Sequence, residues 1–169
     1  MSVDRAVTLL RVAALVLTTL VLQHALFDEL RVFDASGDLL VLLVVAAGLT
    51  SGPDRGALAG FLIGIAADLV VVSPFGLTVL TYTLIGWAVG SVRMVAVDPG
   101  AVHASITAAL AGLASVLLFV AVGVIAGQDQ YFDRHALTVA TVVAGWAFVL
   151  GPSAYRLFRW AAAGPAGAR

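Results

Sequence analysis

Long apolar runs separated by short polar gaps are the dominant pattern along this chain of 169 residues. Runs of this kind are typical of helices that span a lipid bilayer. The gaps carry charges and helix breakers, as in "SGPDR" at 51–55 and "VDPG" at 97–100. The pattern predicts an all-α integral membrane protein with one domain over residues 1–169. Its expected helices cover residues 7–27, 38–51, 56–72, 75–92, 102–126 and 136–158.

The second segment is short for a membrane span. Its apolar part, residues 39–49, has a length of about 16 Å at 1.5 Å per residue, against about 30 Å of hydrocarbon. Two interpretations are open, a short span and a re-entrant element. The second would reverse the orientation of every later segment.

The arginines distinguish these interpretations, because cytoplasmic loops carry the excess of basic residues. With six spans and a cytoplasmic N-terminus, only Arg31 and Arg134 of the nine basic residues lie outside. The alternative without a second span places three outside at best. We therefore expect about six transmembrane helices with both termini in the cytoplasm. The cytoplasmic set is Arg5, Arg11, Arg55, Arg93, Arg156, Arg159 and Arg169.

Composition supports the membrane assignment. The chain is 62% hydrophobic and 11% charged, against about 45–50% and 25% in soluble domains. A net charge of −1 gives no reason to expect nucleic acid as a partner. The absence of cysteine excludes disulfides and thiol catalysis.

The first apolar run could be a signal peptide or an uncleaved helix. We favour an uncleaved helix, because Gln23 occupies a position where cleavage needs a small residue.

A stripe of small residues marks the third segment. Gly56, Gly60, Gly64 and Asp68 recur every fourth residue and so share one helix face. Small-xxx-small stripes allow the backbones of membrane helices to approach closely. The fourth segment repeats the spacing with Thr78, Tyr82, Gly86 and Gly90. We expect these glycines, together with Gly76 after the turn, to form a helix-packing or partner interface.

Asp68 is an ionisable residue inside an apolar segment and needs compensation there. The short "SP" connection at 73–74 predicts an antiparallel hairpin that brings Asp68 close to Thr78, Thr81 and Tyr82. One interpretation makes Asp68 a structural acceptor for these hydroxyls. The other makes it a proton, ligand or partner site.

No catalytic motif stands out. The sequence has no phosphate-binding loop and no nucleophile elbow, and His24, His103 and His135 are far apart. No pair of histidines or acids has metal-ligand spacing on one helix face. We therefore predict a protein that is not an enzyme and has no catalytic residues, metal or cofactor.

Residues 15–95 resemble the rod shape-determining protein MreD family. The resemblance rests on a short second segment that begins at Asp38, the pair Gly60-Phe61, Gly64, Asp68, Gly76, Gly86 and Gly90. Gly37 departs from it, because family members often have proline there.

The resemblance implies a multi-pass subunit of the bacterial inner membrane that acts in cell elongation. Its implied partners are an MreC-like bitopic protein, the peptidoglycan synthase complex and, indirectly, an MreB-like filament. Two other classes are open. One is a small-molecule transporter subunit similar to the substrate-binding component of an energy-coupling-factor importer. The other is a proton-coupled carrier that uses Asp68, although no internal repeat supports it.

Overall fold

Six helices make up the residues that the computed structural model describes, which are 3–23, 25, 38–70, 76–95, 100–125 and 134–162. No strand occurs within these ranges. By length and composition, Val102–Ile125 and Leu137–Ala162 are apolar and long enough to cross a membrane, whereas Ala6–Leu22 and Leu39–Ser51 are shorter apolar helices. The helices are α1 (Val3–Leu22), α2 (Leu39–Ser51), α3 (Pro53–Asp68), α4 (Leu77–Val95), α5 (Ala101–Ile125) and α6 (Arg134–Ala162).

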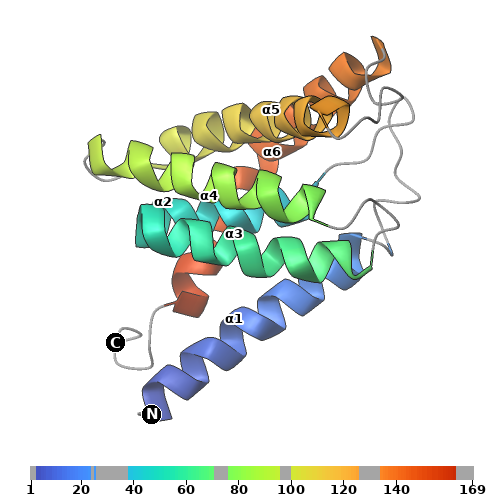
Figure 1. The fold of residues 1–169 in the computed structure, drawn as a ribbon. Helices are drawn as coiled ribbons and strands as arrows, with labels where there is room; N and C mark the ends of the chain where they lie inside the picture. Colours follow the sequence, from blue (N-terminus) through green and yellow to red (C-terminus); the bar gives the residue numbers. More distant parts are fainter. Residues whose placement is uncertain are drawn as a thin grey trace.

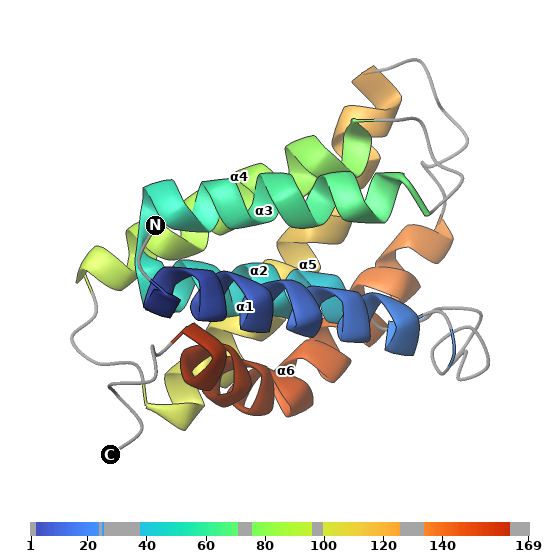
Figure 2. The same ribbon diagram turned by 90° about the horizontal axis from the view of Figure 1, so that it is seen from below.

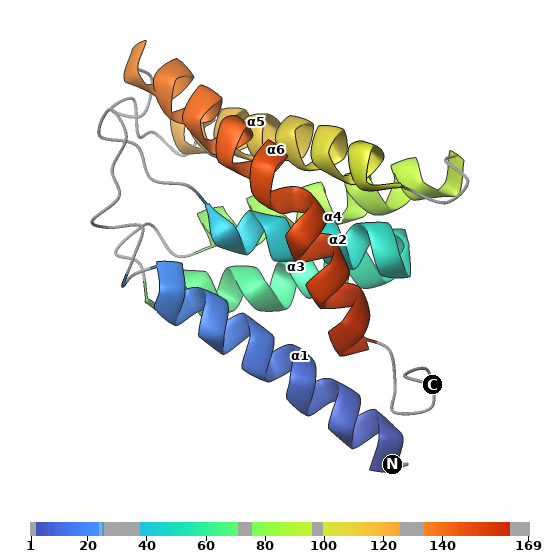
Figure 3. The same ribbon diagram turned by 180° about the vertical axis from the view of Figure 1, so that it is seen from behind.

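Successive helices run in alternating directions through the bundle (Figures 1 and 3). The start of α1, the α2–α3 turn, the end of α4 and the end of α6 lie at one end. We call this the arginine end, because it carries Arg55 in the first turn of α3 and Arg93 and Arg159 in the last turns of α4 and α6. We call the opposite end, where α3 ends and α4 begins, the loop end.

Helix α2 occupies the centre of the bundle and contacts each of the other five helices (Figure 2). Every side chain from Leu40 to Leu49 is buried. A helix that is apolar on all sides requires burial on all sides, and the run of leucine, valine and alanine in α2 meets that condition. Its thirteen residues span about 20 Å, shorter than the hydrocarbon core.

The helix boundaries differ from the expected ones by up to five residues, and the differences at α3 and α4 bear on the position of Asp68. The expected helix 56–72 corresponds to α3. The helix begins at Pro53 rather than at residue 56, because proline is tolerated in the first turn of a helix. It ends at Asp68 rather than at residue 72, and α4 begins only at Leu77. The connection between the two helices is therefore longer than the "SP" pair suggests. Residues 71–75 lie outside the described ranges.

Candidate functional site

The N-terminus of α2 begins inside the bundle, where its free backbone amides need hydrogen-bond partners. Asp38 precedes the helix and has an extended backbone, with φ −101° and ψ 98°. Its Oδ1 accepts hydrogen bonds from the N–H groups of Leu40 (3.0 Å) and Val41 (3.2 Å). Asp38 is therefore the N-cap of α2, and a carboxylate at this position also complements the positive end of the helix dipole.

Two further side chains complete this network. The Oε1 of Gln23, directly after α1, accepts hydrogen bonds from the N–H groups of Leu39 (2.8 Å) and Leu40 (3.2 Å). The hydroxyl of Tyr82 on α4, a residue only 5% exposed, donates to Oδ2 of Asp38 at 2.6 Å. Gln23 and Asp38 are half-buried and Tyr82 is buried, and we call the three residues the buried polar cluster. It joins three helices through hydrogen bonds.

The buried polar cluster explains how a short helix can stand at the centre of the bundle. The first amides of α2 are satisfied by side chains from within the protein and do not need to reach water. Both carboxylate oxygens of Asp38 are engaged, one by amides and one by the Tyr82 hydroxyl. A carboxylate held in this way is suited to stabilising a helix junction rather than to exchanging protons with a substrate.

Sequence reasoning missed most of this cluster. Asp38 was expected only as the start of the second segment, and Tyr82 was assigned to Asp68. The available signal was an aspartate directly before an apolar run, which is a typical helix N-cap pattern. Gln23 has no comparable local signal, because its partner amides are sixteen and seventeen residues away along the chain.

Asp68 ends α3 and is buried, with 6% of its surface exposed. Its Oδ2 accepts a hydrogen bond from the N–H of Gly76 at 2.7 Å. Gly76 has a φ of 101°, a left-handed conformation that glycine adopts readily and other residues adopt at a cost. Asp68 and Gly76 together close the connection between α3 and α4. Among the described residues, Oδ1 of Asp68 has no hydrogen-bond partner.

The expected hydroxyl partners of Asp68 are wrong. Thr81 donates to the carbonyl of Leu77 at 2.9 Å, the usual bond of a helical threonine to its own preceding turn. Tyr82 donates to Asp38, and neither oxygen of Asp68 accepts from Thr78. The cause is the position of the turn. Because α3 ends at Asp68, this carboxylate bonds to Gly76, directly before α4, rather than to hydroxyls within α4.

The glycine stripe of α3 lies directly against α4. A Cβ atom added at Gly64 would be 2.6 Å from the Cα of Val79, and one added at Gly60 would overlap the carbonyl group of Tyr82. A Cβ at Gly56 would overlap the carbonyl of Gly86. Contacts this close are with backbone atoms, which cannot move aside as a side chain can. The glycines therefore allow α3 and α4 to form the most extensive helix pair of the bundle.

Gly90 packs closely, as expected, since an added Cβ would lie 2.5 Å from the Cα of Pro53. Two other glycines, Gly76 and Gly48, differ from the expectation. Gly76 does not belong to the packing set, because an added Cβ would meet nothing within 4 Å, and its role is the turn. Gly48 on α2 was not expected. A Cβ there would be 3.0 Å from the carbonyl oxygen of Gly86, so α2 joins the same close-packed region.

Metal-ligating side chains are not grouped in the described part of the chain. No set of three or more His, Asp or Glu residues there could hold a metal ion. The side chains of His24 and His135, two of the residues considered in the sequence, lie outside the described set.

Comparison with known proteins adds the family. A family model described as rod shape-determining protein MreD matches residues 4–159, well beyond the region 15–95 on which the resemblance rests. Comparisons with curated proteins and with solved structures gave no significant match. The family consists of multi-pass bacterial membrane proteins that act in rod-shape determination and cell elongation and are generally not enzymes. The match covers nearly the whole chain, and this protein belongs to the MreD family.

Proposed function

We propose that this protein is a non-enzymatic scaffold in the inner membrane that binds an MreC-like bitopic protein. Through that partner it holds the peptidoglycan synthase complex and, indirectly, an MreB-like filament. The observation that carries the proposal is the way the polar groups of the buried polar cluster are used. Tyr82 donates to Asp38, and Asp38 and Gln23 accept from the first amides of α2. A carrier would keep such groups free for its substrate.

The proposed orientation has six spans and both termini in the cytoplasm. The alternating helix directions and the gathering of Arg55, Arg93 and Arg159 at one end support it (Figure 1). In this orientation the arginine end faces the cytoplasm. Reporter fusions after Pro53 and Ala168 test it. We expect inactive alkaline phosphatase at both sites, and activity at either one would contradict the orientation.

Substitution of Asp68 separates a scaffold from a carrier. Asn retains a carbonyl oxygen that can accept from the Gly76 N–H, but it cannot titrate or carry charge. We expect Asp68→Asn to restore rod-shaped growth to cells depleted of the protein. Asp68→Leu lacks the acceptor and should be impaired, with a loss of about 1–2 kcal/mol. If Asn fails as completely as Leu although it is inserted at normal levels, the scaffold proposal falls and a transport role is favoured.

A further inference from the structure

A large groove opens between α1 and α3 at the arginine end. Its volume of about 1170 Å³ exceeds the roughly 300–1,000 Å³ that is usual for a small-molecule pocket. Helix α1 packs against α6 and α2 and diverges from α3 toward the arginine end (Figures 1 and 3). We call this space the α1–α3 groove. It has two chemically different parts.

The walls of the α1–α3 groove are apolar. Val12, Val16 and Leu17 of α1 face Leu58 and Leu62 of α3 across it. Large parts of these leucine side chains are not covered by protein, with 63% of Leu17 and 58% each of Leu58 and Leu62 exposed. Uncovered apolar walls that meet in a concave surface suit hydrocarbon chains.

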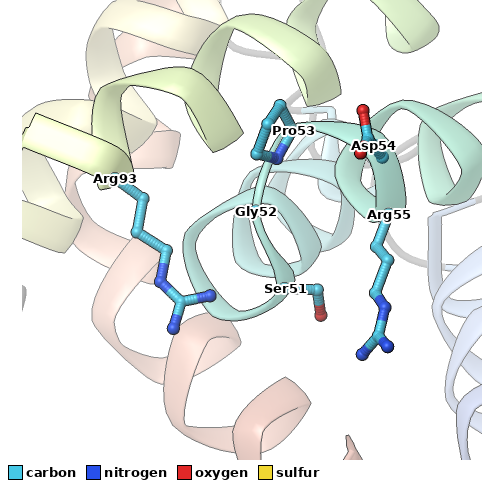
Figure 4. Close-up of a pocket in the computed structure, with 6 residues that line it drawn as sticks. All are labelled: Ser51, Gly52, Pro53, Asp54, Arg55 and Arg93. Carbon is cyan, nitrogen blue, oxygen red and sulfur yellow. The ribbon is translucent and has the colours of Figure 1, made fainter.

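The mouth of the groove is basic. Arg55, Arg93 and Arg159 line the same cavity as the apolar walls. Figure 4 shows that Arg55 and Arg93 extend toward the same side, while Asp54 points the opposite way. These two arginines also line a smaller adjoining cavity of about 410 Å³, whose lining includes Ser51 and the acidic residue Asp54.

The three guanidinium groups are not neutralised by acids in the part of the chain that the structure describes. Arg93 donates to the backbone carbonyl of Thr50, and Arg159 lies over the ring of Tyr155 at 5.6 Å. Arg55 makes no ion pair with a described residue and is exposed. Guanidinium forks match phosphate oxygens in geometry as well as in charge. The mouth therefore favours a phosphate group.

The basic mouth and the apolar wall follow one another along α3, and this order indicates the kind of ligand. Arg55 lies in the first turn, and Leu62 lies about 10 Å deeper at 1.5 Å per residue. We propose that the α1–α3 groove binds an anionic phospholipid from the leaflet at the arginine end. Its phosphate lies at Arg55 and Arg93, with Arg159 beside it, and an acyl chain lies between α1 and α3. A transmembrane helix of a partner would bury three cations against apolar side chains, whereas a phospholipid satisfies both parts of the groove.

In this proposal the lipid fills the α1–α3 groove, where the two helices are not in close contact. Helix α1 is the most sparsely packed helix of the bundle. An anionic phospholipid in the groove thus holds α1 at a fixed distance from α3. Binding at this site is independent of the proposed scaffold function, and it requires only that the arginine end lies at a membrane surface.

Native mass spectrometry of the full chain in mild detergent tests the proposal. The probes are phosphatidylglycerol and phosphatidylcholine with identical acyl chains, and inorganic phosphate serves as a competitor. We expect one retained phosphatidylglycerol, little phosphatidylcholine and no displacement by phosphate. Arg55→Gln should weaken phosphatidylglycerol binding about fivefold, and Arg55→Gln with Arg93→Gln should weaken it further.

Arg156→Gln is the matched control, because Arg156 is an exposed arginine of α6 that does not line the groove. Its binding should equal that of the unmodified protein. Equal retention of phosphatidylcholine would overturn the charge requirement. An equal loss in Arg156→Gln would indicate general surface electrostatics and would also overturn the site. Displacement by inorganic phosphate would mean that the mouth binds phosphate without the acyl chains and would overturn the phospholipid as the ligand. Gel filtration of each variant confirms that it is folded.

Discussion

The hydrogen bond from Tyr82 to Asp38 is the contact whose loss best tests the role of the buried polar cluster. Tyr82→Phe removes the hydroxyl and keeps the ring, so the packing of α4 against α2 is preserved. The substitution leaves Oδ2 of Asp38 without its donor at 2.6 Å, while Oδ1 retains the amides of Leu40 and Val41. The effect is therefore that of one hydrogen bond rather than collapse of the cap.

The expected loss of unfolding free energy in Tyr82→Phe can be estimated from two kinds of measured hydrogen bond. Hydrogen bonds between membrane helices average about 0.6 kcal/mol in double-mutant cycles and reach about 1.7. Hydrogen bonds to charged groups contribute about 1.5–3 kcal/mol. Because the bond is short and Tyr82 is almost completely buried, we expect Tyr82→Phe to lower the free energy of unfolding by about 1–2 kcal/mol.

Reversible unfolding in mixed detergent micelles measures this loss. Asp38→Asn and the double variant complete a thermodynamic cycle, and the two substitutions should couple because both alter the bond between Tyr82 and Asp38. Tyr155→Phe is the control, since Tyr155 is a half-buried α6 tyrosine that donates no hydrogen bond to a described residue. A Tyr82→Phe variant as stable as Tyr155→Phe, or strictly additive effects in the cycle, would refute the assigned contact.

Two glycine substitutions probe the α3–α4 pair. Gly60→Leu should lower stability by several kcal/mol or prevent folding, because its Cβ overlaps the Tyr82 carbonyl. Gly145→Leu should be tolerated, because an added Cβ there meets nothing within 4 Å; similar thermal denaturation of both variants in detergent would contradict the packing argument. Gly76→Ala should cost about 1–2 kcal/mol through its φ of 101° alone. An unchanged melting temperature of Gly76→Ala would contradict this cost. It would show that the turn adjusts to a side chain and that the bond to Asp68 does not depend on glycine at this position.

The helices were predictable from the sequence, and their arrangement was not. In a membrane protein the apolar runs mark the helices directly, and the six expected segments have counterparts in α1 to α6. The central place of α2 could not be deduced in the same way. Lipid and protein interior are both apolar, so an apolar helix surface does not reveal which of the two it faces.

The candidate site shows the same limit. Gly56, Gly60 and Gly64 were found by their spacing, since helix packing needs small residues at regular intervals. The partner of Asp68 was wrong because it depended on the turn position, and a shift of a few residues moves the carboxylate from the side of α4 to its start. The link from Gln23 to α2 depends on tertiary structure alone.

Co-purification with an MreC-like bitopic protein tests the central claim, the scaffold function, most directly. The full chain, tagged and expressed at its native level, is isolated from bacterial membranes in mild detergent, and the retained proteins are identified and quantified by mass spectrometry. We predict that the bitopic protein is retained in an amount comparable to the chain, with peptidoglycan synthases present in smaller amounts. Gly60→Leu, where it is inserted, should retain less partner, and Gly145→Leu should retain the normal amount. Recovery of the chain with components of a transport complex, and without the bitopic protein, would contradict the account.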